Sequence, residues 1–138
     1  MIEKAFIDTN IFIYAFEKST SRKKGKAVEL IRSEEIFNVT SIQVLNEFVS
    51  ATVKKKLLSK NEAVETALLI ESEFDVIPLD SQVFLKGMEI FKNDHIHVSL
   101  WDSFIIAAAV LSKCDTIYSE DMQHNFVVEN VNIKNPLI

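Results

Sequence analysis

The chain has 138 residues, a formal net charge of −5 and 48% hydrophobic residues, with only two Gly and two Pro. This composition argues against a disordered or repeat-built protein, and a single domain over residues 1–138 can bury roughly two-thirds of the surface that its unfolded chain exposes. One cysteine excludes an internal disulfide and a cysteine-rich zinc site, and the longest apolar run, residues 104–111, is far shorter than the ~20 residues that cross a bilayer. We therefore expect a cytoplasmic protein with no membrane partner.

The first half of the chain alternates short apolar runs with segments of helical periodicity. The expected elements are a strand at residues 4–8, a helix at 11–16, a helix at 21–32, a strand at 37–40 and a helix that continues to about residue 54. Thr40 and Gln43 have the spacing of a capping box, in which each side chain bonds a free backbone N–H at a helix start. This motif predicts that the last of these helices begins directly after the second strand.

The second half continues the alternation. The expected elements are a helix at residues 63–73, a strand at 76–79, a helix to about 92, a buried helix at 104–111, a strand at 116–118 and an edge strand near 127–133. Ser59 and Ser99 begin two further capping boxes, and Asp80 is a suitable cap for the helix between them. Strands that alternate with helices predict an α/β fold around a mainly parallel sheet of four to five strands, whose carboxyl ends carry the functional side chains.

Four acidic residues lie where predicted strands or helices begin or end. They are Asp8, Glu47, Asp102 and Asp121. Carboxylates that meet repel one another, and a divalent cation with oxygen ligands relieves that repulsion. If folding brings the four together, metal-dependent chemistry on a phosphodiester is the leading hypothesis.

The neighbours of these acids have expected supporting roles. Asn10 is too short to reach far, so we expect it to orient the acid two positions before it or a bound water. In an extended segment alternate residues point to the same side, so Ser119 and Asp121 should face together and Glu120 should face away. The sequence alone assigns no function to Glu120.

Each acid also has a simpler structural explanation. Asp8 is a suitable cap for the helix that follows it, and Asp121 stands in a turn, where Asp often bonds the local backbone. Glu47 lies opposite the apolar stripe of its helix, where a Glu more often faces solvent than binds a ligand. Asp102 is the last residue of a capping box, a role that is compatible with metal binding because the helix start keeps the carboxylate ionised.

Basic and histidine side chains form a few local groups. The two basic runs are Arg22, Lys23, Lys24 and Lys26, and Lys54, Lys55 and Lys56. Each run is either a site for phosphates or a solvated helix face. His95 and His97 lack the further ligands of a zinc site, so we expect them in a loop, whereas His124 is close enough to the last acid to contact a phosphate.

With these residues in view, the sequence resembles the PIN-domain nucleases, most closely the VapC-type toxins of toxin-antitoxin pairs. The resemblance covers essentially the whole chain. The matching segments are Phe6-Ile7-Asp8-Thr9-Asn10, Asn46-Glu47-Phe48, Trp101-Asp102-Ser103 and Tyr118-Ser119-Glu120-Asp121-Met122-Gln123-His124. Ser119 stands where Thr is common and Asn125 where Gly often follows, and neither change removes a candidate ligand.

The resemblance implies a fold, a chemistry and partners. The fold is a three-layer α/β/α arrangement around a mainly parallel sheet. The resemblance also implies Mg²⁺ or Mn²⁺ bound at the four acids, with Asn10 and Ser119 in support, endonuclease activity on RNA, a homodimer and a cognate antitoxin protein. The hypothesised mechanism is attack on phosphorus by a metal-activated water.

Two other functions fit parts of the same pattern. A phosphohydrolase with an Asp nucleophile would also place an acid after the first strand, but it needs a second acid close by, and position 10 is Asn. An inactive module that binds RNA or protein would keep the fold without the chemistry. The presence of all four acids argues against that loss.

Overall fold

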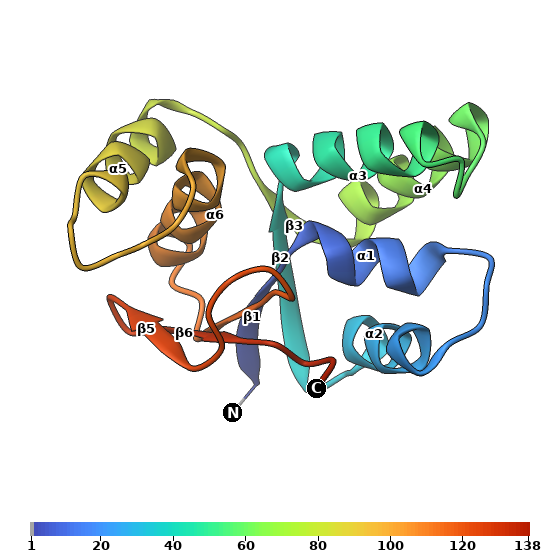
Figure 1. Cartoon of the computed structure of the whole chain (residues 1–138), viewed down its shortest axis with the longest axis horizontal. Coiled ribbons are helices and arrows are strands. Elements are labelled where there is room, and N and C mark those ends of the chain that lie inside the picture. Colours follow the sequence, from blue (N-terminus) through green and yellow to red (C-terminus); the bar gives the residue numbers. More distant parts are fainter. Residues whose placement is uncertain (1) are drawn as a thin grey trace.

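A computed structural model describes residues 2–138 as alternating helices and strands (Figure 1). In chain order they are β1 Glu3–Ile7, α1 Thr9–Phe16, α2 Arg22–Arg32, β2 Ile36–Ser41, α3 Ile42–Lys54, α4 Lys60–Glu73, β3 Asp75–Ile77, α5 Ser81–Phe91, α6 Leu100–Leu111, β4 Thr116–Tyr118, β5 Phe126–Val128 and β6 Val131–Lys134. Within this described part of the chain, no helix combines the length and apolar character that a bilayer crossing requires.

The strands form one sheet in the order β3-β2-β1-β4-β6-β5. All neighbours are parallel except the last pair, β6 and β5, which is antiparallel. The expectation of four to five strands was therefore too low, because the region near 127–133 forms a hairpin of two strands. Glu129 and Asn130 form its tip with positive φ angles of 45° and 72°, the backbone that a tight hairpin turn requires.

Helices cover both sides of the sheet, as the three-layer expectation required. In Figure 1, α5 and α6 lie on one side of β1 and β2, and α1, α2, α3 and α4 lie on the other. The central strand β1 ends in Ala5, Phe6 and Ile7, all of which are fully buried. A strand between two helical layers has no solvent face, and this explains why its sequence does not alternate between apolar and polar residues.

Helix α6 lies against the sheet and is buried over most of its length. Its buried residues are Ser103, Phe104, Ile105, Ile106, Ala107, Ala108 and Ala109. Helix α5 packs closely against α6 at Gly87, where a Cβ atom would lie 2.6 Å from Cε1 of Phe104. The absent side chain therefore allows the two helices to approach each other.

Capping side chains set the helix starts. The boxes expected at Ser59 and Ser99 supply the caps of α4 and α6, and Asp80 caps α5. The expectation for Thr40 was wrong by one residue, because Ser41 caps α3 by accepting from Val44 N–H at 3.3 Å. The Thr40 hydroxyl instead donates to the backbone oxygen of β1 at Ile7, since β2 extends further than predicted.

Candidate active site

The carboxyl ends of β1 and β4 bring two distant segments together. These parallel strands pair in a register that aligns Ile7 with Tyr118, so the next residues, Asp8 and Ser119, are neighbours. The Ser119 hydroxyl donates to Asp8 Oδ2 at 2.7 Å, and the Asp8 N–H donates to the Tyr118 oxygen at 3.0 Å. The sheet therefore fixes both the backbone and the side chain of Asp8.

Asp8 is both a helix cap and a buried acid. Its Oδ1 accepts from the Thr9 N–H at 2.7 Å, which makes Asp8 the cap of α1, and its exposed fraction is 4%. Burial raises the pKa of Asp8 to about 6 although the bonds from Ser119 and Thr9 favour the ionised form. The nearby charges of Asp102 and Glu47 raise this pKa further. Asp8 therefore caps α1 and at the same time lies close to two other acids.

Glu47 points toward the same place and is only partly exposed. Its Oε2 accepts from the Thr9 hydroxyl at 2.8 Å, and its Oε1 accepts from Gln43 Nε2 at 3.1 Å. Gln43 also donates to the backbone oxygen of Trp101 at 3.0 Å, which ties α3 to the first turn of α6. Glu47 is therefore held by Thr9 and Gln43 and remains partly open to solvent.

Asp102 lies in the first turn of α6, where its N–H donates to the Ser99 hydroxyl at 3.1 Å. Ser99 therefore caps α6 as expected, but the Asp102 carboxylate makes no bond to the Ser99 N–H that would complete a capping box. Burial raises the pKa of Asp102, and the charges of Asp121 and Glu47 raise it further. Asp102 also raises the pKa of Asp8, so it lies within electrostatic reach of all three other acids.

Asp121 is more exposed and is held by Asn10. The Asn10 amide donates to Asp121 Oδ2 at 2.7 Å, and the Asp121 N–H donates to the Ser119 hydroxyl at 3.2 Å. Burial raises the pKa of Asp121, as do the charges of Glu120 and Glu47, whereas Lys55 lowers it. Asn10 thus supports the acid after β4, where the sequence had suggested the acid after β1 or a water.

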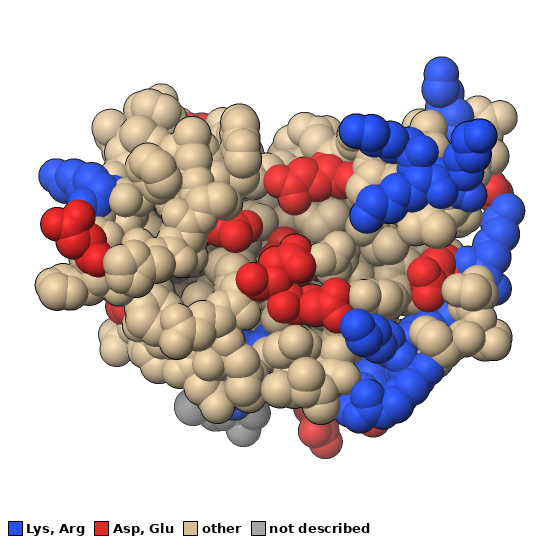
Figure 2. All heavy atoms as spheres, viewed as in Figure 1, with Lys and Arg blue, Asp and Glu red and all other residues tan. Residues whose placement is uncertain are grey.

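The four acids form one group, which we call the acidic cluster: Asp8, Glu47, Asp102 and Asp121. The charge of Glu47 raises the pKa of the other three members. Asp102 also raises the pKa of Asp8, and Asp121 raises that of Asp102. Figure 2 shows acidic side chains near the middle of one face, with Lys and Arg side chains on the α2 and α3–α4 side. Among residues 2–138 no three His, Cys, Asp or Glu side chains are already arranged to hold a metal ion. The donors are nevertheless oxygens that repel one another, which is the set that Mg²⁺ and Mn²⁺ prefer.

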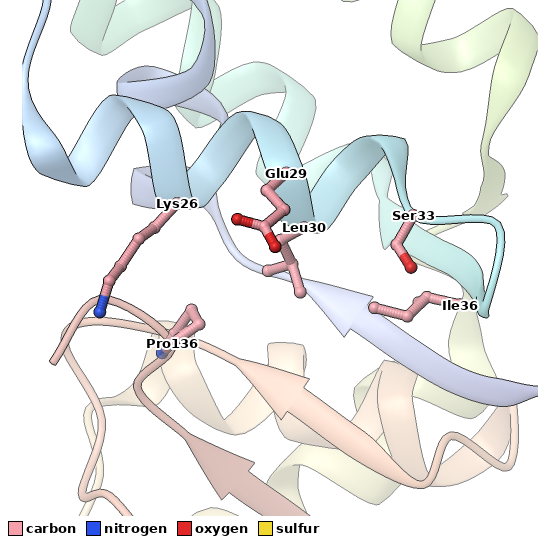
Figure 3. A pocket seen from close by; sticks show the side chains of 6 residues that line it. All are labelled: Lys26, Glu29, Leu30, Ser33, Ile36 and Pro136. Atoms are coloured by element: carbon pink, nitrogen blue, oxygen red, sulfur yellow. The ribbon is translucent and has the colours of Figure 1, made fainter.

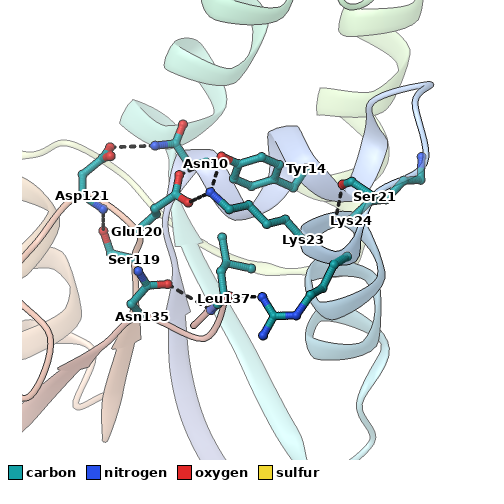
Figure 4. A network of polar contacts seen from close by, with 11 residues as sticks. Asn10, Tyr14, Ser21, Lys23, Lys24, Ser119, Glu120, Asp121, Asn135 and Leu137 are labelled. Carbon is teal, nitrogen blue, oxygen red and sulfur yellow. Dashed lines mark hydrogen bonds and ion pairs between the residues drawn. The ribbon is translucent and has the colours of Figure 1, made fainter.

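Three residues of the site were missed from the sequence. Thr9 and Gln43 hold Glu47, and Glu120, expected to face away from Asp121, contacts Tyr14 and a lysine (Figure 4). Thr9 bonds across 38 positions, so no local spacing could have revealed it. The four-residue spacing from Gln43 to Glu47 on one helix was the one available signal.

Two open grooves share Glu47 as a wall. One, of about 380 Å³, is lined by Ile42, Gln43, Asn46, Glu47, Leu79 and Trp101. The other, of about 490 Å³, is lined by Asn46, Glu47, Ser50, Ala51, Lys54 and Lys55. An apolar groove with an exposed indole and a groove with two lysines therefore meet at the acidic cluster.

The remaining candidates lie outside this arrangement. His95 and His97 are exposed in the loop between α5 and α6, as expected. His124 Nδ1 accepts from the Asn135 N–H at 2.9 Å, which leaves Nε2 as the ring nitrogen that carries the proton and can donate. A further pocket, lined by Lys26, Glu29, Leu30, Ser33, Ile36 and Pro136, lies between α2 and the C-terminal segment and contains no member of the acidic cluster (Figure 3).

Solved structures with the same fold include toxins and toxin–antitoxin complexes. VapC20 from Mycobacterium tuberculosis, described as a Sarcin-Ricin loop cleaving toxin, has 20% sequence identity and a TM-score of 0.69 over 85% of this chain and 89% of its own. A toxin–antitoxin complex from Klebsiella pneumoniae has 20% identity and a TM-score of 0.69 over 96% and 97%. VapBC2 from Rickettsia felis, bound to a DNA fragment from their promoter, has 17% identity and a TM-score of 0.68 over 96% and 98%.

Identities this low establish a shared fold and nothing finer. A comparison with curated protein sequences gives no significant match. The PIN domain family, in contrast, matches residues 5–127, a stretch that contains the whole acidic cluster. The chain therefore belongs to the PIN-domain family.

Proposed function

We propose that this chain is a Mg²⁺- or Mn²⁺-dependent endoribonuclease and the toxin of a type II toxin-antitoxin pair, acting in the cytoplasm. The observation that carries the proposal is the acidic cluster, in which the charge of Glu47 raises the pKa of Asp8, Asp102 and Asp121 beside the carboxyl ends of β1 and β4. Nucleases are typical of the PIN-domain family, and clustered carboxylates are the oxygen ligands of hard divalent ions. RNA is accordingly the proposed substrate.

Neighbouring side chains hold the proposed ligand oxygens in place by hydrogen bonds. Ser119 and Thr9 hold Asp8, Thr9 and Gln43 hold Glu47, and Asn10 holds Asp121. When bound, the divalent ion would lower the pKa of a water and offset the charge that develops on the phosphate. Side chains that are held before the ion arrives lose little conformational freedom when it binds. The carboxylates repel a phosphodiester as long as no cation is present, so the ion and the substrate should bind together.

The two grooves that share Glu47 offer a path for RNA. Lys54 and Lys55 can bind the phosphate backbone on one side of the acidic cluster. Trp101, a residue that is 60% exposed, offers its indole as a stacking surface for an unpaired base on the other side. The proposal therefore favours single-stranded segments and predicts that cleavage weakens steeply with added salt.

A cognate antitoxin and a homodimer complete the proposal. Several of the similar solved structures are toxin–antitoxin complexes, and exposed apolar side chains such as Phe84 and Leu85 on α5 are available for protein contacts. An arginine of the antitoxin would match the acidic cluster, because its planar fork pairs with carboxylates. The expected result is co-purification with a small protein that suppresses RNA cleavage.

RNA cleavage by the purified chain tests the proposal. With Mn²⁺ the wild type should cut unstructured RNA, and Asp8→Asn should lose that activity while it keeps the fold. Asp94→Asn, the same chemical change in the exposed loop between α5 and α6, is the matched control and should cut like the wild type. Equal cleavage by Asp8→Asn and the wild type would contradict the mechanism.

Two alternatives have separate signatures. Both oxygens of Asp8 already accept hydrogen bonds in a buried position, which argues against a nucleophilic Asp that attacks phosphorus. A trapped phospho-aspartate would nevertheless favour that phosphohydrolase. Calorimetry with Mn²⁺ separates the nuclease from an inactive module, because a module without metal chemistry would release no heat of binding at neutral pH.

A further inference from the structure

The short loop after β4 is held at each of its four residues. We call Ser119, Glu120, Asp121 and Met122 the 119–122 loop. Ser119 bonds Asp8, Asp121 bonds Asn10, and Met122 is buried. Three of these anchors are expected for a loop that presents an acid to a metal site. The fourth anchor, at Glu120, is a separate feature of this chain.

Glu120 is held by two residues from two helices (Figure 4). Its Oε1 accepts from the Tyr14 hydroxyl of α1 at 2.9 Å, and its Oε2 accepts from Lys23 Nζ of α2 at 2.7 Å. Lys23 Nζ also lies 5.2 Å from the centroid of the Tyr14 ring, within the range of a cation–π contact. Both carboxylate oxygens of Glu120 are therefore engaged, and its side chain is only 22% exposed.

Helix α1 holds two consecutive loop residues with one face. Asn10 and Tyr14 are four positions apart on α1, so their side chains lie one above the other. Asn10 bonds Asp121 and Tyr14 bonds Glu120. Lys23 adds α2 to the same contact. One face of α1 therefore sets the direction of the loop, and Lys23, from the first basic run, adds a contact from α2.

The charge of Lys23 also explains how a further acid is tolerated here. Glu120 stands next to Asp121, and an unpaired carboxylate at this position would add to the repulsion within the acidic cluster. Lys23 offsets that charge by direct contact. An acidic residue can therefore serve as an anchor for the loop.

We propose that Glu120, Tyr14 and Lys23 are positioning residues that hold the 119–122 loop so that Asp121 stays within reach of the other acids. The inference rests on the proposed function, because Asp121 matters only if the acidic cluster binds a divalent ion. None of the three needs to touch the ion or the RNA. They act through the direction of the loop backbone.

The test separates positioning from simple charge effects by comparing three variants. Glu120→Gln removes a negative charge, Lys23→Met removes a positive charge, and Tyr14→Phe changes no charge. If only charge mattered, Lys23→Met would tighten Mn²⁺ binding, Glu120→Gln would weaken it and Tyr14→Phe would leave it unchanged. Positioning instead predicts that all three weaken Mn²⁺ binding measured by calorimetry, by about tenfold for the ion-pair variants, which is the lower end for groups that orient metal ligands.

Hydrogen exchange of the metal-free protein gives a readout that does not depend on the ion. Peptides that cover the 119–122 loop should exchange faster in each variant, whereas peptides from α6 and β1 should be unchanged. The double variant Glu120→Gln/Lys23→Met should bind Mn²⁺ no more weakly than the single variant with the lower affinity, because either change breaks the same contact. Opposite shifts in Mn²⁺ affinity, or unchanged exchange of the loop, would overturn the proposal.

An ion pair elsewhere in the fold supplies the matched control. Lys86 of α5 and Glu129 of the β5–β6 turn lie 2.7 Å apart, the same distance as Lys23 and Glu120. Lys86→Met should leave Mn²⁺ affinity and cleavage unchanged. If the wild type binds no Mn²⁺, the proposed function fails. If it binds Mn²⁺ and cleaves RNA but the three variants match it, only the positioning role fails.

Discussion

The Ser119 hydroxyl donates to Asp8 Oδ2 at 2.7 Å and joins two residues 111 positions apart. The same oxygen accepts from the N–H groups of Asp121 at 3.2 Å and Met122 at 3.4 Å. A hydroxyl has one donor and two lone pairs, so this side chain uses its full hydrogen-bonding capacity in a fully buried position. One small residue therefore links the acid after β1 to the loop after β4.

Removal of this hydroxyl should destabilise the protein. Ser119→Ala leaves one buried oxygen, the buried Met122 N–H and the partly buried Asp121 N–H without their partner, so we expect the free energy of unfolding to fall by ~1–3 kcal/mol. Urea denaturation at neutral pH without metal measures the change. Ser72→Ala, which removes an exposed hydroxyl from α4, is the control and should shift stability by less than about 0.5 kcal/mol. Equal stability of Ser119→Ala and the wild type would contradict this account.

The metal-free protein should lose stability as the pH rises from about 4 to about 6. Burial raises the pKa of Asp8 from its ordinary 3.8 to about 6, so the folded state binds the proton more tightly than the unfolded state. The stability from this group is fully present below pH 3.8 and is lost as the pH rises through 6. Since each pKa unit corresponds to about 1.4 kcal/mol, the loss is at most ~3 kcal/mol.

Urea denaturation across this pH window, compared with Asp8→Asn, checks the prediction. Asn does not titrate, so the variant should show a flatter profile between pH 4 and 6. Glu62 acts in the opposite sense, because the Ser59 backbone N–H and Lys18 lower its pKa to about 2, and its contribution is lost only as the pH falls below about 4.5. If the free energy of unfolding of the wild type rises with pH over this window, or follows the same profile as Asp8→Asn, then ionisation of Asp8 does not destabilise the fold.

Divalent ions should stabilise the fold at neutral pH through the acidic cluster. A ligand that binds only the folded state adds about 2.7 kcal/mol at 100 times its Kd, and this appears as a higher Tm. We expect Mn²⁺ to raise the Tm of the wild type and to leave the Tm of Asp102→Asn nearly unchanged. Asp94→Asn should respond like the wild type. An equal rise in all three proteins would place the ion outside the acidic cluster.

The two glycines should respond in opposite directions to the same substitution. Gly87→Ala places a Cβ 2.6 Å from Cε1 of Phe104, so the buried Phe104 ring or the two helices must shift, and we expect a loss of ~1–3 kcal/mol. Gly25 lies in α2 with nothing within 4 Å of the added Cβ, so Gly25→Ala should gain up to ~1 kcal/mol from helix propensity. Thermal unfolding of both variants measures the contrast. Similar shifts for the two would refute the close approach at Gly87.

Local patterns predicted the elements well, because capping and periodicity act within a few residues. Ser59, Asp80 and Ser99 cap helices as expected, and the strand at 116–118 has the expected bounds. The error at Thr40 has a similar local origin. Thr40 and Ser41 are both suitable caps, and the length of β2 decides between them.

The partners within the site could not be predicted in the same way. That Asn10 would bond Asp121, and that Glu47 would be held by Thr9, depends on which strands are neighbours and in which register. Strand order is a property of the whole chain that no short motif encodes. The sequence therefore identified which acids to examine but not which side chains hold them.

The strand order of the sheet has a consequence for synthesis of the protein on the ribosome. β1 is made first, yet it pairs with β4, which follows α6 near the end of the chain. A nascent polypeptide that has not yet emerged beyond α5 carries Asp8 and Glu47 but neither Asp102 nor Asp121. Premature termination of translation before α6 would thus leave the acidic cluster half built.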